Sequence, residues 1–309
     1  MQGTRNKLVP IAPGAGKIWD IQHWRYLSQL GVVIFIAVVL ILKEINGESG
    51  GYASPEAFCP LGGFETLYYT VITGGKFVQH THFSNLIIFG ALIISAVAAG
   101  SFFCGWICPL GTIQQAVTGF RRWLQKRVGF INSAAKGLNS WSRHLAPLDR
   151  WLRYAKYLLL GWIIWGTIAT GTMVFRDVDP WAGIINIIEL GVTIGFVVFI
   201  VVVLAALIGD RVWCRYLCPL GAIIGIVGKI GFMRVQREPD KCINCKLCTR
   251  KCPMHIQVHE KGRVLSSECN SCLNCVNVCP SPGALDARVC LPIPEKAASN
   301  QTEGLANEP

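Results

Sequence analysis

The chain has 309 residues, of which 52% are hydrophobic and 15% charged, and its mean hydropathy is +0.42. A soluble domain usually has about 25% charged residues, so this composition excludes an ordinary soluble protein and also a disordered one. Lys and Arg exceed Asp and Glu by 29 to 18, a formal net charge of +11. No nucleic-acid-binding motif accompanies this excess, which fits cytoplasmic loops of a membrane protein beside anionic lipid headgroups.

Four apolar runs approach or exceed the ~20 residues that a helix needs to cross a bilayer. They are Tyr26–Leu42, Asn85–Phe103, Tyr154–Phe175 and Ile184–Ile208. The first has a basic flank before it, so a cleaved signal peptide is the alternative to a membrane span. The run ends in Lys-Glu-Ile-Asn without a small-residue cleavage site, which favours an uncleaved anchor.

The basic residues predict the orientation of the four spans. Eight Lys and Arg, with Asp149 as the only acid, lie between the second and third runs, and the segment after the fourth run is also basic. The two remaining links are acidic on balance. The positive-inside rule therefore predicts cytoplasmic N- and C-termini in a bacterial inner membrane. Within the basic loop, residues 112–129 read as an amphipathic helix on the inner surface, or as an ordinary solvated helix.

Several residues on the outer side carry weaker signals. Cys59 stands in Cys59-Pro60-Leu61-Gly62-Gly63, and the aromatic segment after it packs against the bundle or offers a quinone headgroup pocket. His80 and His82 precede the second span, as loop residues or as quinol or haem contacts. Glu189 lies near the start of the fourth run, as a boundary residue or a proton acceptor. Cys290 has no partner in any motif.

An internal repeat places two cysteine pairs at the inner ends of the second and fourth spans. Phe103-Cys104-Gly105-Trp106-Ile107-Cys108-Pro109-Leu110-Gly111 recurs, 110 residues later, as Trp213-Cys214-Arg215-Tyr216-Leu217-Cys218-Pro219-Leu220-Gly221. The membrane part is thus predicted to be two helical hairpins in parallel repeat, with both pairs at a similar depth.

Three interpretations of Cys104, Cys108, Cys214 and Cys218 stay open. The four thiolates hold a metal or small cluster, they are redox-active dithiols, or they are small buried side chains in a structural turn. Clustered thiolates suit soft metals, which favours the first interpretation. The repeat of an identical spacing weighs against the third.

The C-terminal part carries the most specific pattern of the chain. The run Cys242-x-x-Cys245-x-x-Cys248-x-x-x-Cys252-Pro253 is followed by the same spacing at Cys269, Cys272, Cys275 and Cys279-Pro280. This doubled run is typical of two-cluster bacterial ferredoxins, in which the fourth cysteine of each run binds the other cluster. It predicts one [4Fe–4S] cluster on Cys242, Cys245, Cys248 and Cys279, and a second on Cys252, Cys269, Cys272 and Cys275. Zinc knuckles or disulfides explain the doubled spacing less well.

The predicted fold class is an all-α transmembrane bundle of four helices, in two repeated hairpins, followed by an α+β ferredoxin-like domain with two [4Fe–4S] clusters. The predicted divisions are a cytoplasmic segment at 1–25, the membrane domain at 26–233, the ferredoxin domain at 234–290 and a disordered tail at 291–309.

The combination of four spans, the paired Cys-x-x-x-Cys-Pro motifs and the doubled cluster motif resembles the NapH/MauN-type membrane ferredoxins, related to the membrane half of NosR-type proteins. The resemblance covers roughly residues 20–290. It implies an electron-transfer component that links a quinone pool or a cytoplasmic donor to a periplasmic oxidoreductase, with the ferredoxin domain in the cytoplasm. The element at 59–63 departs from the nitrate-reductase member of the family and leaves the terminal partner open.

The sequence therefore predicts a membrane iron–sulfur electron-transfer protein with lipid, a quinone and an oxidoreductase as partners. The alternative is a redox-sensing or maturation accessory protein for a periplasmic oxidoreductase. A channel or transporter is disfavoured because the spans hold almost no charge and no broken helix with paired polar groups. No flavin, nucleotide or haem motif is present, which argues against a self-contained dehydrogenase.

Overall fold

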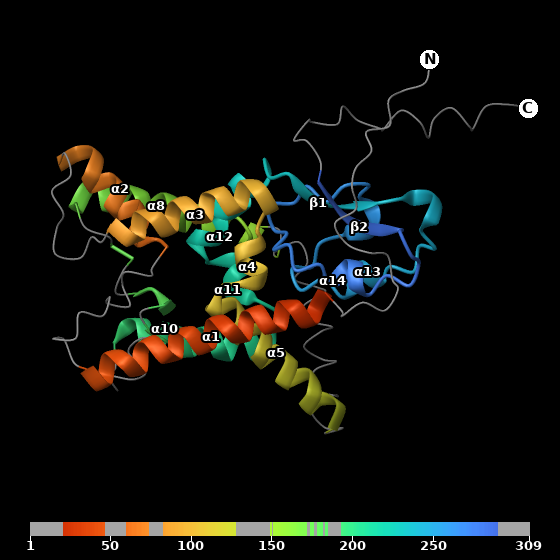
Figure 1. Ribbon diagram of the computed structural model, residues 1–309, viewed down its shortest axis with the longest axis horizontal. Coiled ribbons are helices and arrows are strands. Elements are labelled where there is room, and N and C mark those ends of the chain that lie inside the picture. Colours follow the sequence, from red (N-terminus) through yellow and green to blue (C-terminus); the bar gives the residue numbers. More distant parts are fainter. Residues whose placement is uncertain are drawn as a thin grey trace, which may run out of the picture.

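The computed structural model describes residues 21–46, 60–73, 83–127, 149, 151–171, 174–175, 178–181, 183–184 and 193–289. Long helices form one part of the molecule, and a two-stranded sheet with short helices forms the other (Figure 1). The second part lies at one end of the long helices. Four of the predicted candidates, Cys59, His80, His82 and Glu189, lie outside the described residues, as do Cys290 and the predicted tail.

The four apolar runs contain the helices α1 (Ile21–Asn46), α3 (Phe83–Ala99), α8 (Ala155–Thr170) and α10 (Ile194–Ile208). Local backbone signals set their ends. Gly100 and Gly171 follow α3 and α8 at φ of 65° and 71°, a conformation that favours glycine and stops a helix. Thr193 caps α10 by accepting a hydrogen bond from the backbone N–H of Phe196.

Among the described helices, α1 alone is long and apolar enough to cross a membrane, over Ile21–Leu42. The helices α3, α8 and α10 have 17, 16 and 15 residues, which is below the ~20 of a full span. The predicted four-span bundle is thus supported by one helix of sufficient length, and its other three spans stay a prediction. Along α1 most apolar side chains are exposed, Ile34 and Phe35 by more than half.

The two copies of the repeat fold in the same way. In each, a five-residue helix leads through a cysteine into a longer helix: α4 (Phe102–Trp106) into α5 (Pro109–Arg127), and α11 (Val212–Tyr216) into α12 (Pro219–Gly228). The backbone N–H of Cys108 donates to the carbonyl of Phe103, and Cys218 donates to Trp213 in the same way. The predicted repeat therefore extends to the backbone hydrogen bonds.

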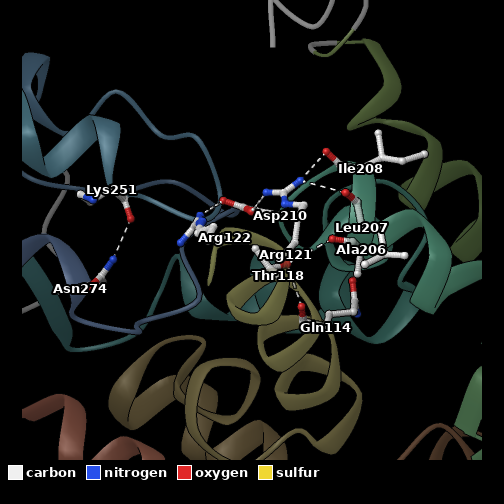
Figure 2. A network of polar contacts seen from close by, with 10 residues as sticks. All are labelled: Gln114, Thr118, Arg121, Arg122, Ala206, Leu207, Ile208, Asp210, Lys251 and Asn274. Carbon is white, nitrogen blue, oxygen red and sulfur yellow. Dashed lines mark hydrogen bonds and ion pairs between the residues drawn. The ribbon is translucent and has the colours of Figure 1, made fainter. Parts of the chain in front are cut away.

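Each of these longer helices packs against a helix of the other copy. The helix α5 lies on α10, and α12 lies on α3 as well as on α8 of its own copy. Figure 2 shows how the first contact is fastened: Arg121 of α5 donates to the carbonyl oxygens of Leu207 and Ile208, which the end of α10 leaves without helical partners. Arg121 and Arg122 both pair with Asp210. These contacts between the two copies bring the two cysteine pairs together.

The remaining helix of the long part is α2 (Gly62–Thr73), which packs on α3. The second part is closed by the antiparallel strands β1 (Met233–Arg237) and β2 (Leu285–Val289), paired from Met233 opposite Val289 to Arg237 opposite Leu285. Between them lie η4 (Pro239–Lys241), α13 (Leu247–Arg250), η5 (Val258–Glu260) and α14 (Asn274–Asn277). Its core includes Val235, Met254, Ile256, Val264 and Leu285.

Candidate electron-transfer site

The first predicted cluster set comes together in the structure. Cys279, which follows α14, lies within electrostatic reach of Cys245, Cys248 and Cys242, which are 31 to 37 residues earlier in the chain. Burial and the proximity of these thiols raise the pKa of the Cys279 thiol, while a backbone hydrogen bond from Ser281 acts against them. The fourth cysteine of the second run therefore lies with the first three of the other run, as the crossed arrangement requires.

The second predicted set also comes together. Burial, with repulsion from Cys272 and Cys252, raises the pKa of the Cys269 thiol to about 12, and Cys275 is affected by all three of the others. An apolar cavity beside β1 is lined by all four sulfur-bearing residues. Four thiols around one apolar space suit a positively charged iron–sulfur core, which they would bind as thiolates, so these residues fit a [4Fe–4S] cluster.

The two cysteine loops share an unusual backbone. Asn244 and Lys246 flank Cys245 with φ of 53° and 59°, and Ser271 and Leu273 flank Cys272 with φ of 50° and 54°. Residues with a Cβ pay about 1–2 kcal/mol each in this left-handed region. These left-handed residues occur at the same places in both loops, where they bend the backbone around the cysteines.

The paired membrane-side cysteines form a third group. Cys218 lies within electrostatic reach of Cys214, Cys104 and Cys108, so the four thiols form one group. Burial is the main reason that the pKa of the Cys108 thiol rises to about 11, and that those of Cys104 and Cys218 rise as well. None of the twelve described cysteines is in a disulfide.

The motif Cys-Pro-Leu-Gly positions its sulfur at a helix N-terminus. Cys218 is the N-cap of α12, Pro219 occupies the first helical position, and the sulfur accepts a hydrogen bond from the N–H of Gly221 at 3.3 Å. In the first copy, Cys108 accepts from the N–H groups of Gly111 and Leu110. Proline lacks the N–H that would go unpaired there, and the helix dipole favours negative charge on the cap. The sequence therefore places one sulfur of each pair at a helix N-terminus, whose N–H groups act against the rise in pKa that burial causes.

No three His, Cys, Asp or Glu side chains in the described ranges are placed to hold a single metal ion. Sulfurs bound to one ion at about 2.3 Å would lie about 3.8 Å apart. The result holds for the ferredoxin loops and for the membrane-side cysteines alike.

The loop of the second set lies directly on the first membrane-side motif. Gly105, between Cys104 and Cys108, is so close to the loop that an added Cβ would lie 2.3 Å from the carbonyl oxygen of Asn270 and 3.4 Å from the backbone N of Cys272. Only a residue without a side chain permits this approach. The backbones of two predicted redox groups are therefore in contact.

Polar side chains of α1 clamp this contact. Gln22 and Arg25 both donate to the carbonyl oxygen of Cys272, at 3.1 and 3.0 Å, and Gln29 donates to the carbonyl of Gly105 at 2.9 Å. All three are buried. From the motif itself, the indole N–H of Trp106 donates to the carbonyl of Ser271 at 3.1 Å. Buried donors that find acceptors in this way hold two segments in one register.

A buried ion pair ties the same loop to α8. Lys156 Nζ lies 2.6 Å from Glu268 Oε1, with side-chain exposures of 2% and 10%. Beside it, the hydroxyl of Tyr157 donates to Ser267 Oγ at 3.3 Å. Glu268 directly precedes Cys269. Sequence reasoning missed this pair, Gly105 and the α1 clamp, because each depends on segments more than 70 residues apart.

Comparison with known proteins agrees with this arrangement. A family model described as "4Fe-4S binding domain" matches residues 81–130 and 192–237, which are the two copies of the repeat, and one described as "4Fe-4S dicluster domain" matches residues 234–280. The ferredoxin-type protein NapH of Haemophilus influenzae is 31% identical, over 83% of this chain and 85% of its own.

Two further relatives are similar over shorter stretches. The methylamine utilization ferredoxin-type protein MauN of Paracoccus denitrificans is 31% identical, over 58% of this chain and 61% of its own. The NapH protein of Escherichia coli K12 is 29% identical, over 62% and 64%. No solved structure matches this chain.

Proposed function

Because the chain belongs to the NapH/MauN family of ferredoxin-type electron transport proteins, we propose that it is a membrane iron–sulfur relay. It passes electrons between the quinone pool or the membrane-side cysteines and a partner oxidoreductase. Cys242, Cys245, Cys248 and Cys279 would hold one [4Fe–4S] cluster, and Cys252, Cys269, Cys272 and Cys275 the other. When bound, each cluster supplies a one-electron carrier.

The contact between Gly105 and Asn270 is the observation that carries the proposal. It joins the loop of the second cysteine set to the motif that holds Cys104 and Cys108. Cys214 and Cys218 lie in electrostatic reach of that first pair. The three cysteine groups thus form a continuous series within one chain. A series of this kind suits stepwise electron transfer better than it suits an isolated structural motif.

The exposure of equivalent loop positions supports an order within the series. Ile243 and Asn270 both follow the first cysteine of their loops, but Ile243 is 66% exposed and Asn270 is 5% exposed. The first set therefore offers its loop to solvent, where a soluble partner approaches, while the second set faces the long helices. Electrons would enter or leave through the first set and reach the membrane-side cysteines through the second.

The surfaces of the long helices support a membrane location for that end of the series. The helix α1 exposes Leu30, Ile34 and Val38, which need apolar surroundings. On α5, Phe120 and Trp123 stack on each other, and Arg127 lies 5.6 Å from the Trp123 ring centroid. Aromatic and basic side chains on one exposed helix suit a membrane surface with anionic lipid. We propose an inner-membrane protein with its ferredoxin domain and both termini in the cytoplasm.

Anaerobic stopped-flow measurement tests the relay. The detergent-purified protein is reduced with dithionite, freed of excess reductant and mixed with a soluble quinone analogue, as wild type and as Cys104→Ser and Cys214→Ser. Both variants should keep the EPR signals of two reduced clusters and lose rapid reoxidation. Slow reoxidation that is the same in all three proteins would contradict the relay and favour a sensing or accessory role.

A further inference from the structure

Arg211 is a buried cation beside the four membrane-side cysteines. Arg211 is 2% exposed, and as the N-cap of α11 it has a left-handed backbone, at φ of 49°. Nη1 donates to the carbonyl oxygen of Cys104 at 2.8 Å, and Nη2 donates to Gln115 Oε1 at 3.1 Å. Both acceptors are neutral. Within the described ranges Arg211 makes no ion pair with a carboxylate, since the adjacent Asp210 pairs with Arg121 and Arg122.

The fold makes room for this guanidinium. At Gly111, in the first Cys-Pro-Leu-Gly segment, an added Cβ would lie 3.2 Å from Arg211 Nη1. The residue that precedes Arg211 by the repeat length of 110 is Ser101, so one copy alone carries the cation. Arg211 thus reaches across the repeat, from the start of α11 to the pair held by α4 and α5.

An arginine stays protonated in a protein, and a buried charge without compensation costs several kcal/mol. Two other buried cations near these cysteines have acids: Lys156 pairs with Glu268, and Arg215 with Asp149. The charge of Arg211 acts on Cys104 and Cys108, and also on the like charge of Arg25. Neutral thiols give it no compensation. Four thiolates around a metal core leave an excess of negative charge that does.

Gln114 of α5 is a second indication of negative charge at these cysteines. Its side chain is fully buried, at the position where the second copy has the equally buried Ile224. Nε2 donates to Cys214 Sγ at 3.5 Å, whereas Oε1 has no hydrogen-bond partner. Figure 2 shows Gln114 on the face of α5 that meets α10, one turn before Thr118. A buried amide aimed at sulfur stabilises a thiolate more than a thiol, because hydrogen bonds to charged acceptors are stronger.

We propose that Cys104, Cys108, Cys214 and Cys218 hold, as thiolates, a metal centre whose net charge is negative. Arg211 is its counter-ion, and Gln114 is its hydrogen-bond donor. The inference deepens the proposed function, on which it rests, since it decides for a metal–thiolate centre over protonated dithiols.

Metal retention by the anaerobically purified full chain tests the proposal. Iron and other metals per chain are measured before and after an EDTA challenge, in wild type, Arg211→Met, Arg211→Lys and the control Arg122→Met. Arg122 is 55% exposed and contacts Asp210 rather than the cysteines. Wild type, Arg211→Lys and Arg122→Met should keep metal beyond that of two [4Fe–4S] clusters. Arg211→Met should release this additional metal at least tenfold faster, with the EPR signals of the two ferredoxin clusters unchanged.

A second pair of variants covers the case in which Arg211→Met does not fold. Gln114→Leu should also release the additional metal faster, whereas Ile224→Leu, the repeat-equivalent control, should not. Equal retention in wild type and Gln114→Leu, and in any folded Arg211→Met, would overturn the proposal. So would wild-type protein without additional metal whose four membrane-side cysteines react as free thiols. If Cys104→Ser still abolished quinone-dependent reoxidation in that case, the relay would stand and this inference alone would fall.

Discussion

Gly105 and Asn270 meet backbone to backbone, so closely that a single added carbon on Gly105 would lie 2.3 Å from the Asn270 carbonyl oxygen. The first residue lies in a cysteine motif at the end of the apolar helices. The second lies in a cysteine loop of the ferredoxin-like part. The neighbouring hydrogen bond from Trp106 to Ser271 joins residues that are 165 positions apart in the chain. This close contact between two predicted redox segments gives the relay a physical path.

The substitution Gly105→Ala should weaken this junction. The methyl group has no space, so the loop at Asn270 must move, at a cost of about 1–3 kcal/mol. We expect slower reoxidation by a quinone analogue and an altered EPR signal of the second cluster. Gly119→Ala on α5 is the control, because nothing lies within 4 Å of its added Cβ. Equal kinetics in the two variants would show that the contact is not on the path.

The crossed assignment of the ferredoxin cysteines predicts which cluster each fourth ligand supports. Cys279→Ala should remove the cluster of Cys242, Cys245 and Cys248, and Cys252→Ala should remove the other. Iron analysis and EPR of the reduced proteins check this: Cys279→Ala should retain only the second cluster, and Cys252→Ala should retain only the first. Loss of the same signal in both variants would contradict the crossed arrangement.

The Lys156–Glu268 pair should behave as a buried ion pair. Removing one partner leaves the other charge uncompensated, so Lys156→Met and Glu268→Leu should each cost about 3–5 kcal/mol of stability. The double variant should cost clearly less than the sum of the two. Thermal unfolding in detergent, followed by cluster absorbance, measures all four corners of the cycle. Additive effects would mean that the pair contributes nothing as a pair.

The hydrogen bond from Tyr216 to Asp149 predicts a dependence on alkaline pH. Burial, with this hydrogen bond, raises the pKa of Tyr216 from its usual 10 to about 12. The contribution of Tyr216 to stability is therefore complete below pH 10 and is lost as the pH rises towards 12. Tyr216→Phe should lower stability below pH 10 by about 1.5–3 kcal/mol, the strength of a hydrogen bond to a charged group. The difference from wild type should shrink between pH 10 and 12; a constant difference would contradict this account.

The parts of the site that sequence reasoning predicted are those encoded in local spacing. The runs around Cys245 and Cys272 predicted two thiol sets, and the structure groups them as the spacing requires. The repeated motif predicted that Cys104 and Cys218 come together. Periodicity placed the apolar helices. The helices α3, α8 and α10 are shorter than the runs that contain them, because Gly100 and Gly171 end α3 and α8 and Thr193 caps the start of α10.

What sequence reasoning missed depends on contacts between distant segments. In the sequence, Lys156 lies at the start of an apolar run and suggests a boundary residue. Only the structure shows that Glu268, 112 residues later, lies beside it. Differences between the two copies of the repeat were the available signal. When the two copies are aligned at a separation of 110 residues, Gly105 is aligned with Arg215, Gln114 with Ile224 and Ser101 with Arg211. Each departure from the repeat marks a position where the ferredoxin-like part or the buried charge requires a different residue.

The most direct test of the relay asks which ferredoxin cluster communicates with the membrane side. Cys245→Ala should lose the first cluster and keep the second, and Cys272→Ala should do the opposite, as EPR of each reduced protein verifies. The remaining clusters are then mixed with a quinone analogue in single turnover. The account predicts near wild-type reoxidation in Cys245→Ala and slow reoxidation in Cys272→Ala. Rapid reoxidation in Cys272→Ala, or equal rates in both variants, would contradict it.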